Sequence, residues 1–170
     1  MSFVIRPLLF PFALLYGLIV RLRHWCYNVG IFKVHTFAVP TICVGNIAVG
    51  GTGKSPMVEY LIQKFQNRHK VAVLSRGYKR KTKGFLLADK TSTVLDLGDE
   101  PFQFWQKYKD IILAVCANRV EGIQKICSLP TPPNLIILDD AFQHRPVKAK
   151  FNIVLTAYAQ LFTDDWLLPM

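Results

Sequence analysis

An apolar run, a glycine-rich loop and the start of a helix follow one another over residues 41–56. Glycines let backbone N–H groups curl around an anion, and the helix that follows points its positive end at the same place. The Lys54 ammonium would reach the outer phosphates of a nucleotide, and the Ser55 hydroxyl would bind Mg²⁺. The order strand, loop, helix therefore predicts a nucleotide-phosphate site. Its predicted residues are Gly50, Gly51, Thr52, Gly53, Lys54 and Ser55.

The loop differs at two positions from better-known nucleotide-binding loops. Ala48 occupies the first glycine position of the common pattern G-x-x-x-x-G-K-S/T. Val49 stands where partitioning-type and metal-cluster carrier ATPases have a lysine. No asparagine in the sequence is followed by lysine, so the guanine-reading motif Asn-Lys-x-Asp of small GTPases is absent. These differences argue against a regulatory GTPase and against a partitioning-type ATPase.

Apolar runs alternate with segments of helical periodicity along the chain. Each run is apolar throughout, which is typical of strands buried on both faces. The sequence therefore predicts an α/β fold in which a parallel sheet is covered by helices on both faces. Ligands of such sheets bind at the carboxyl ends of the strands. Strands are expected in the apolar run that begins at 41 and near 71–75, 85–87, 111–115, 135–138 and 151–155, and helices near 57–65, 102–108 and 119–127.

Two acidic segments are candidates for metal binding and proton transfer. The run 135–138 ends in Asp139, and an acid after a buried strand holds Mg²⁺ in many nucleotide-hydrolysing enzymes and kinases. Asp99 and Glu100 are adjacent carboxylates in a loop expected before a helix. They could cap that helix, or one of them could accept a hydroxyl proton during phosphoryl transfer. Spacing alone does not separate these two interpretations.

Further polar residues gather after the predicted strands. Asp140, Gln143 and His144 follow the strand that ends at 138, and the hypothesis of substrate contact competes with that of a polar turn. A basic segment, 76–83, contains Arg76 and Tyr78, and it is either a solvated loop or a site for an anion. The formal net charge of +10 also favours an anionic partner. The four cysteines form no C-x-x-C pair, which is typical of reduced thiols in the cytosol.

The N-terminal segment is apolar over residues 8–20, and Arg21, Arg23 and Trp25 follow it. This run is shorter than the roughly 20 residues that a spanning helix needs. No small-residue cleavage site follows it, so it does not resemble a secretory signal. Its aromatic and basic residues predict a helix in the membrane interface, attracted by anionic lipid. A helix packed on the protein core is the alternative.

Taken in order, these segments resemble the tetraacyldisaccharide 4′-kinase family, the lipid A 4′-kinases of Gram-negative bacteria. The resemblance rests on the segments 45–56, 75–78, 98–101, 118–120 and 139–144. Ala141 and Lys79 occupy positions where this family commonly has glycine. A membrane-associated nucleotide-hydrolysing enzyme and a non-catalytic nucleotide-binding module remain as alternative functions.

The resemblance implies transfer of the γ-phosphoryl group of ATP, with Mg²⁺, to the 4′-hydroxyl of a tetraacylated disaccharide 1-phosphate. It implies Asp99 as the catalytic base, with Lys54 and Asp139 also catalytic, and Ser55, Glu100 and Asp139 as the metal side. It further implies peripheral attachment to anionic lipids at the cytoplasmic face of the bacterial inner membrane, and no nucleic-acid or protein partner is expected. The residues expected to contact the lipid A precursor are Arg76, Tyr78, Arg119, Asp140, Gln143 and His144.

Two regions are expected, a membrane-interface helix at 1–36 and a P-loop kinase domain at 37–170. In the family, a second and smaller domain follows the segment that corresponds to 167–169. Because this sequence stops at Met170, the resemblance implies an N-terminal portion without assured activity of its own.

Overall fold

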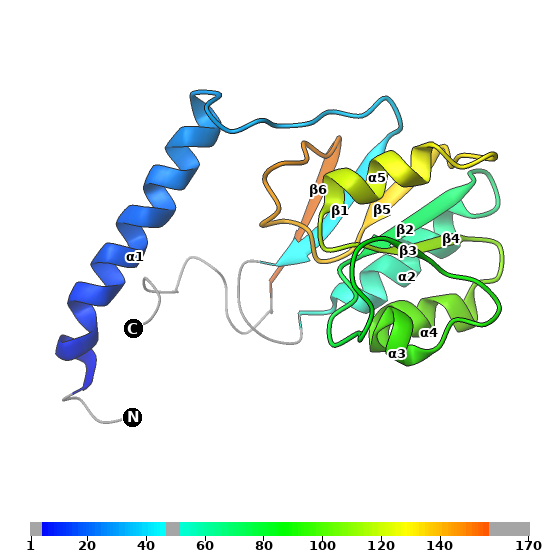
Figure 1. Cartoon of the computed structure of the whole chain (residues 1–170), viewed down its shortest axis with the longest axis horizontal. Helices are drawn as coiled ribbons and strands as arrows, with labels where there is room; N and C mark the ends of the chain where they lie inside the picture. Colours follow the sequence, from blue (N-terminus) through cyan, green and yellow to red (C-terminus); the bar gives the residue numbers. More distant parts are fainter. Residues whose placement is uncertain (1–4, 47–51, 157–170) are drawn as a thin grey trace.

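The computed structural model describes residues 5–46 and 52–156, which build a six-stranded sheet and its covering helices. The strand order is β3-β4-β2-β5-β1-β6 (Figure 1). Every pairing is parallel except that of β3 with β4, so the predicted parallel sheet is confirmed apart from one antiparallel edge. The strands are β1 Thr41–Asn46, β2 Val71–Ser75, β3 Leu86–Leu87, β4 Ile112–Val115, β5 Leu135–Leu138 and β6 Phe151–Leu155.

Helices cover both faces of the sheet, as the apolar strands predict (Figure 1). Neighbouring residues of one strand point to opposite faces. In β2, Val73 packs in the cluster that contains Ile62 of α2, whereas Leu74 packs in the cluster that contains Ile123 of α5. Phe104 of α4 belongs to the first cluster. The helices are α1 Ile5–Asn28, α2 Lys54–Phe65, α3 Val94–Leu97, α4 Asp99–Lys107 and α5 Arg119–Cys127.

The segment before α4 differs from the prediction. The helix begins at Asp99, not near residue 102, and the short helix α3 precedes it. Proline fits the first turn of a helix, where its missing N–H has no partner to lose. Pro101 is in that turn, so the Gly-Asp-Glu-Pro segment opens the helix and is not a separate loop. As a result, Asp99 and Glu100 have fixed helical positions.

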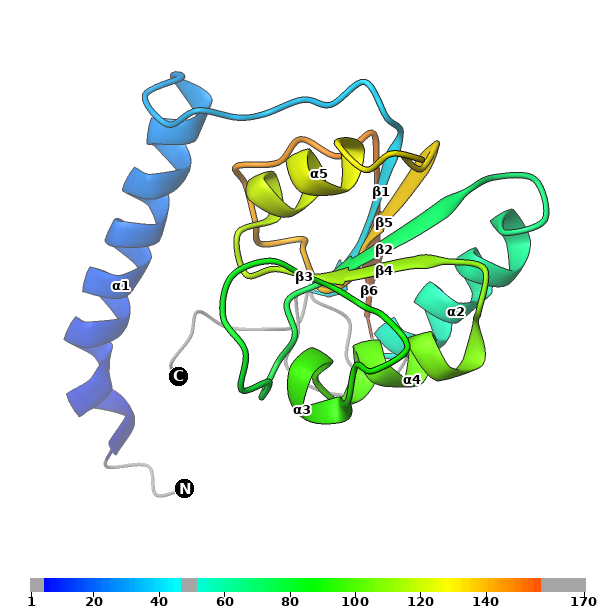
Figure 2. The same cartoon turned by 45° about the vertical axis from the view of Figure 1, so that its right-hand side comes forward.

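The N-terminal helix α1 stands apart from the sheet in both views (Figures 1 and 2). It is longer than the apolar run, because it continues through the basic residues to Asn28. Several of the large apolar side chains described in α1 are exposed by more than half, among them Leu18 at 64% and Leu22 at 57%. In the described part of the chain, no helix has the length and apolarity needed to cross a bilayer. The exposure of these side chains favours the interfacial helix over a helix packed on the core, and membrane binding itself stays a prediction.

Candidate active site

The carboxyl ends of β1, β2 and β5 meet at one edge of the sheet, and α2 begins at this edge. Gly53, at the start of α2, has a φ angle of 82°, a left-handed conformation that glycine adopts without strain. Thr52 follows the undescribed part of the loop, and its hydroxyl is buried without a hydrogen-bond partner among the described residues. The predicted phosphate ligands Gly50 and Gly51 lie outside the described residues.

Lys54 is held between the ends of two neighbouring strands. Its ammonium Nζ donates a hydrogen bond to Asn46 Oδ1 at 3.1 Å. The same Nζ lies 3.4 Å from a carboxylate oxygen of Asp140. Asp140 is the second residue after β5 and has a φ of 48°, uncommon for a residue other than glycine. The sequence predicts Lys54 and Asp140 as site residues, and the structure brings them together.

Ser55 and Glu100 also meet, although they are 45 residues apart. The Ser55 hydroxyl donates a 2.7 Å hydrogen bond to Glu100 Oε1. Helix α4 has Gly98 at its N-cap, without a side-chain capping bond. Neither Asp99 nor Glu100 is therefore the N-cap residue, and both are exposed carboxylates in the first turn. Neither side chain caps the helix directly, but both can stabilise its N-terminus, because negative charge in the first turn interacts favourably with the helix dipole.

Asp139 is the most buried acid of the site, with 1% of its surface exposed. Burial raises its pKa to about 6, although the Ser75 hydroxyl, which donates to Asp139 Oδ2 at 2.8 Å, acts in the opposite direction. Glu100 and Asp140 raise this pKa further by charge repulsion. A buried carboxylate with a raised pKa is typical of functional sites. Burial of such a group costs stability, so its presence needs a reason other than folding.

Arg119 occupies a different environment from the expected substrate entrance. It is 2% exposed, and its guanidinium donates to the backbone carbonyls of Cys116 at 2.6 Å and Asp139 at 2.8 Å. The residue therefore fixes the turn that carries Asp139 and Asp140. Burial lowers the pKa of this guanidinium from its ordinary value.

The basic segment after β2 is a folded loop. Arg76 and Tyr78 are exposed, and Tyr78 keeps 74% of its surface. Arg80 instead turns inward, where its guanidinium donates to the Val115 carbonyl at 3.5 Å and the Thr82 hydroxyl at 3.3 Å. Lys79 has a φ of 63°, a left-handed conformation that glycine adopts more readily than lysine.

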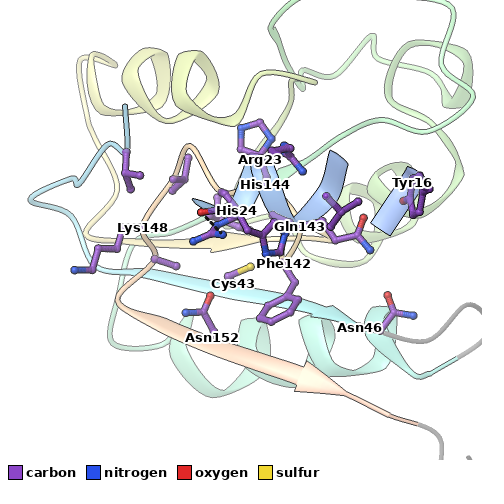
Figure 3. Close-up of a pocket in the computed structure, with 17 residues that line it drawn as sticks. Tyr16, Arg23, His24, Cys43, Asn46, Phe142, Gln143, His144, Lys148 and Asn152 are labelled. Atoms are coloured by element: carbon purple, nitrogen blue, oxygen red, sulfur yellow. Dashed lines mark hydrogen bonds between the residues drawn. The ribbon is translucent and has the colours of Figure 1, made fainter. Parts of the chain in front are cut away.

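A cavity of about 850 Å³ separates α1 from the sheet edge (Figure 3). Tyr16, Val20 and His24 line it from one face of α1, and Gln143 and His144 line it from the opposite wall. Burial lowers the pKa of His144, and nearby arginines lower it further. Its Nε2 is buried and has no hydrogen-bond partner among the described residues. The structure thus places Gln143 and His144 in a space large enough for part of a ligand.

Sequence reasoning missed the residues that connect these parts. Asn46 and Ser75 each end a predicted strand, and a polar last residue in a buried strand is the signal that could have found them. Arg145 links the cavity wall to α1: it donates to Asn28 Oδ1 at 2.9 Å and stacks over the Tyr27 ring at 5.2 Å. No local pattern predicts such a contact, because more than a hundred residues separate the partners.

Phe142 also fixes the cavity wall, through a close approach to Gly45. A Cβ atom on Gly45 would lie 2.4 Å from Phe142 Cβ, a distance that side chains do not tolerate. Glycine at this strand position therefore lets the segment with Gln143 and His144 lie directly on β1.

A metal site at this edge would use few protein ligands. Among the described residues, no group of three or more His, Cys, Asp or Glu side chains could hold a metal ion. Mg²⁺ commonly binds through one or two carboxylates, with waters and phosphates completing its shell. The adjacent oxygens of Ser55 and Glu100, and the carboxylate of Asp139, are of the type that it prefers.

Comparisons with known proteins agree with this geometry. Residues 5–170 match the family described as tetraacyldisaccharide-1-P 4′-kinase. Tetraacyldisaccharide 4′-kinases of Flavobacterium psychrophilum and Parabacteroides distasonis are 56% and 52% identical, over 97% and 96% of this chain. This covers 48% and 45% of those proteins, so the chain spans about half the length of the curated relatives it matches.

A solved structure shows the same fold. The crystal structure of LpxK from Aquifex aeolicus in complex with ATP matches with a TM-score of 0.77 and 35% sequence identity. The match covers 88% of this chain and 48% of that protein. Since the family match covers nearly the whole sequence, the chain belongs to the tetraacyldisaccharide-1-P 4′-kinase family.

Proposed function

We propose that this chain carries the nucleotide site of an ATP-dependent kinase that phosphorylates the 4′-hydroxyl of a tetraacyldisaccharide 1-phosphate, a lipid A precursor. One observation carries the proposal: Lys54, Ser55 and Glu100 converge at the carboxyl edge of the sheet, beside a cavity lined by α1. The relatives named tetraacyldisaccharide 4′-kinase and the ATP complex of LpxK support it.

In this proposal the phosphate loop, residues 50–55, binds the phosphates of ATP, and Lys54 directs its ammonium to the outer ones. Ser55, Glu100 and Asp139 would hold Mg²⁺, which when bound neutralises charge on the transferred group. Asp99 accepts the proton of the acceptor hydroxyl. Its exposure and its position one residue before Glu100 support this role, since a base must reach an entering substrate.

The acceptor would occupy the cavity between α1 and the sheet edge. Gln143 and His144 are proposed to contact the sugar, because both line the cavity. A neutral imidazole, favoured by the lowered pKa of His144, can donate one hydrogen bond and accept another. Asp140, which already pairs with Lys54, would lie between nucleotide and acceptor. Arg76 and Tyr78, exposed on the basic loop, are proposed for the acceptor's phosphate, and Arg119 supports the site from within.

We further propose that residues 1–36 form a membrane-interface region, which contains α1, and that residues 37–170 belong to the kinase domain. The exposed apolar residues of α1 support this division, because a monomeric soluble protein rarely exposes such a row. Arg21 and Arg23 suit the anionic headgroups of the cytoplasmic leaflet of the bacterial inner membrane.

Nucleotide binding and transfer test the proposal. The intact protein should bind Mg-ATP, and Lys54→Ala should weaken this binding at least about tenfold, as loss of a charge-assisted hydrogen bond does. The matched control is Lys64→Ala on the same helix, since Lys64 is exposed and contacts Tyr60. Equal affinity in wild type and Lys54→Ala would contradict the phosphate site. Binding without phosphoryl transfer to the acceptor would instead favour a non-catalytic nucleotide-binding module.

A further inference from the structure

We propose that Asn46 is a positioning residue that aims the Lys54 ammonium at the phosphates of the nucleotide. The inference rests on the proposed function, because it assumes that Lys54 binds ATP. It assigns a role to a side chain that lies outside the phosphate loop, at the end of the preceding strand.

The contact between the two residues has a fixed chemical direction. An ammonium group has only donors, so the amide oxygen of Asn46, not its nitrogen, must face Lys54. The distance of 3.1 Å between Nζ and Oδ1 is that of a normal hydrogen bond. Lys54 is mostly buried, with 21% of its side chain exposed, which strengthens a hydrogen bond to a charge.

Neighbouring backbone contacts hold Asn46 in place. Asn46 is the last residue of β1, and it pairs with Leu155 of β6 in the parallel register. On the other side of β1, the Ala141 N–H donates to the Val44 carbonyl at 3.3 Å, which ties the segment after β5 to this strand. These contacts on both sides of β1 give the Asn46 side chain a defined direction at the end of the strand.

The two partners of Lys54 differ in charge, and this difference explains the use of an amide. Asp140 attracts the ammonium by charge. Its side chain is 56% exposed, so it has room to move away from Lys54 when phosphates bind. Asn46 is neutral and orients the ammonium without cancelling its charge. After phosphate binding, the ammonium still has three donors to share between the amide and the phosphate oxygens.

Asn46 also lines the cavity beside α1, at the tip of β1 (Figure 3). A direct contact with the acceptor is therefore a competing role for the same side chain. The two roles predict different measurements: a positioning residue changes the affinity for ATP through Lys54, whereas an acceptor contact changes only the KM of the acceptor.

A double-mutant cycle in the intact protein tests the proposal. Asn46→Leu keeps the side-chain size and removes the oxygen, and we expect about a tenfold weaker Kd for Mg-ATP. In a Lys54→Ala background, the same substitution should cause no further loss. The control Asn67→Leu changes an exposed asparagine in the turn after α2, outside the cavity, and should leave the Kd for Mg-ATP unchanged. If Asn46→Leu folds poorly, Asn46→Ala gives the same comparison without apolar bulk.

Equal losses in both backgrounds would show a merely structural effect and overturn the inference. A change confined to the acceptor's KM would overturn it in favour of the competing role. Wild-type protein that binds no Mg-ATP would overturn the proposed function and this inference with it. Normal wild-type binding with an unaffected Asn46→Leu variant would overturn the inference alone.

Discussion

Asp139→Asn should stabilise the nucleotide-free protein at neutral pH, although it removes a proposed metal ligand. Burial raises the pKa of this carboxyl from 3.8 to about 6. One pKa unit corresponds to about 1.4 kcal/mol, so two units make the ionised form in the folded protein costly by about 3 kcal/mol. An amide is neutral at every pH and can still accept the hydrogen bond from Ser75.

The sign of the pH dependence follows from linkage. Between pH 3.8 and 6 the folded carboxyl holds a proton that the unfolded one has released. The stability contribution of the protonated form is thus fully present below pH 3.8 and is lost as pH rises to 6. The difference in unfolding free energy between Asp139→Asn and wild type should therefore grow across this window and stay constant above it.

Urea denaturation followed by circular dichroism, with a chelator present, measures this difference at pH 4.5 and pH 7.5. We expect the unfolding free energy of Asp139→Asn to exceed that of wild type by about 3 kcal/mol at pH 7.5 and by clearly less at pH 4.5. The control Asp110→Asn alters an exposed aspartate and should give a small difference at both values. A variant less stable than wild type at pH 7.5, or a difference independent of pH, would refute this reasoning.

Three other variants test the packing, the backbone and the membrane helix. Gly45→Ala places a Cβ 2.4 Å from that of Phe142, so it should lower the unfolding free energy of the protein by about 1–3 kcal/mol in thermal or urea unfolding. An unchanged stability would contradict the close packing. Lys79→Gly relieves a left-handed residue and should raise stability by about 1 kcal/mol, measured in the same way; a loss would show that the Lys79 side chain matters more than the backbone. The double variant Leu18→Asp and Leu22→Asp should show less co-sedimentation with anionic vesicles. The control Val94→Asp, at an exposed position of α3, should sediment as wild type does. Unchanged sedimentation of the double variant would argue against an interfacial helix.

The sheet could be predicted because its strands are short apolar runs between clear turn signals. Five of them begin and end within one residue of the expected bounds, and the helix from Arg119 to Cys127 agrees at both ends. Strand ends then predict the place of the site, since parallel strands bring their carboxyl ends to one edge. Asp139 and Asp140 reach this edge for that reason.

Other features depend on contacts between distant residues. The sequence does not predict the correct start of α4, because Gly98 and Pro101 are typical of loops. Both residues also fit the start of a helix, and there the structure places them. The inward turn of Arg80 and the burial of Arg119 satisfy backbone carbonyls of β4 and of the segments that follow β4 and β5, which sequence patterns do not reveal. The cavity is lined by α1 and by residues 138–149, which are far apart in the sequence, so no local pattern predicts it. A basic residue in a sequence can thus be a substrate ligand or a structural clamp, and only its environment separates the two.

Phosphoryl transfer tests the central proposal most directly. The intact protein, supplied with γ-labelled ATP, Mg²⁺ and tetraacyldisaccharide 1-phosphate in detergent, should form a labelled bisphosphorylated lipid. Asp99→Ala should bind ATP normally but lose nearly all transfer, because the acceptor hydroxyl keeps its proton. A wild-type protein that forms no such product, or an Asp99→Ala variant that matches it, would contradict the proposal.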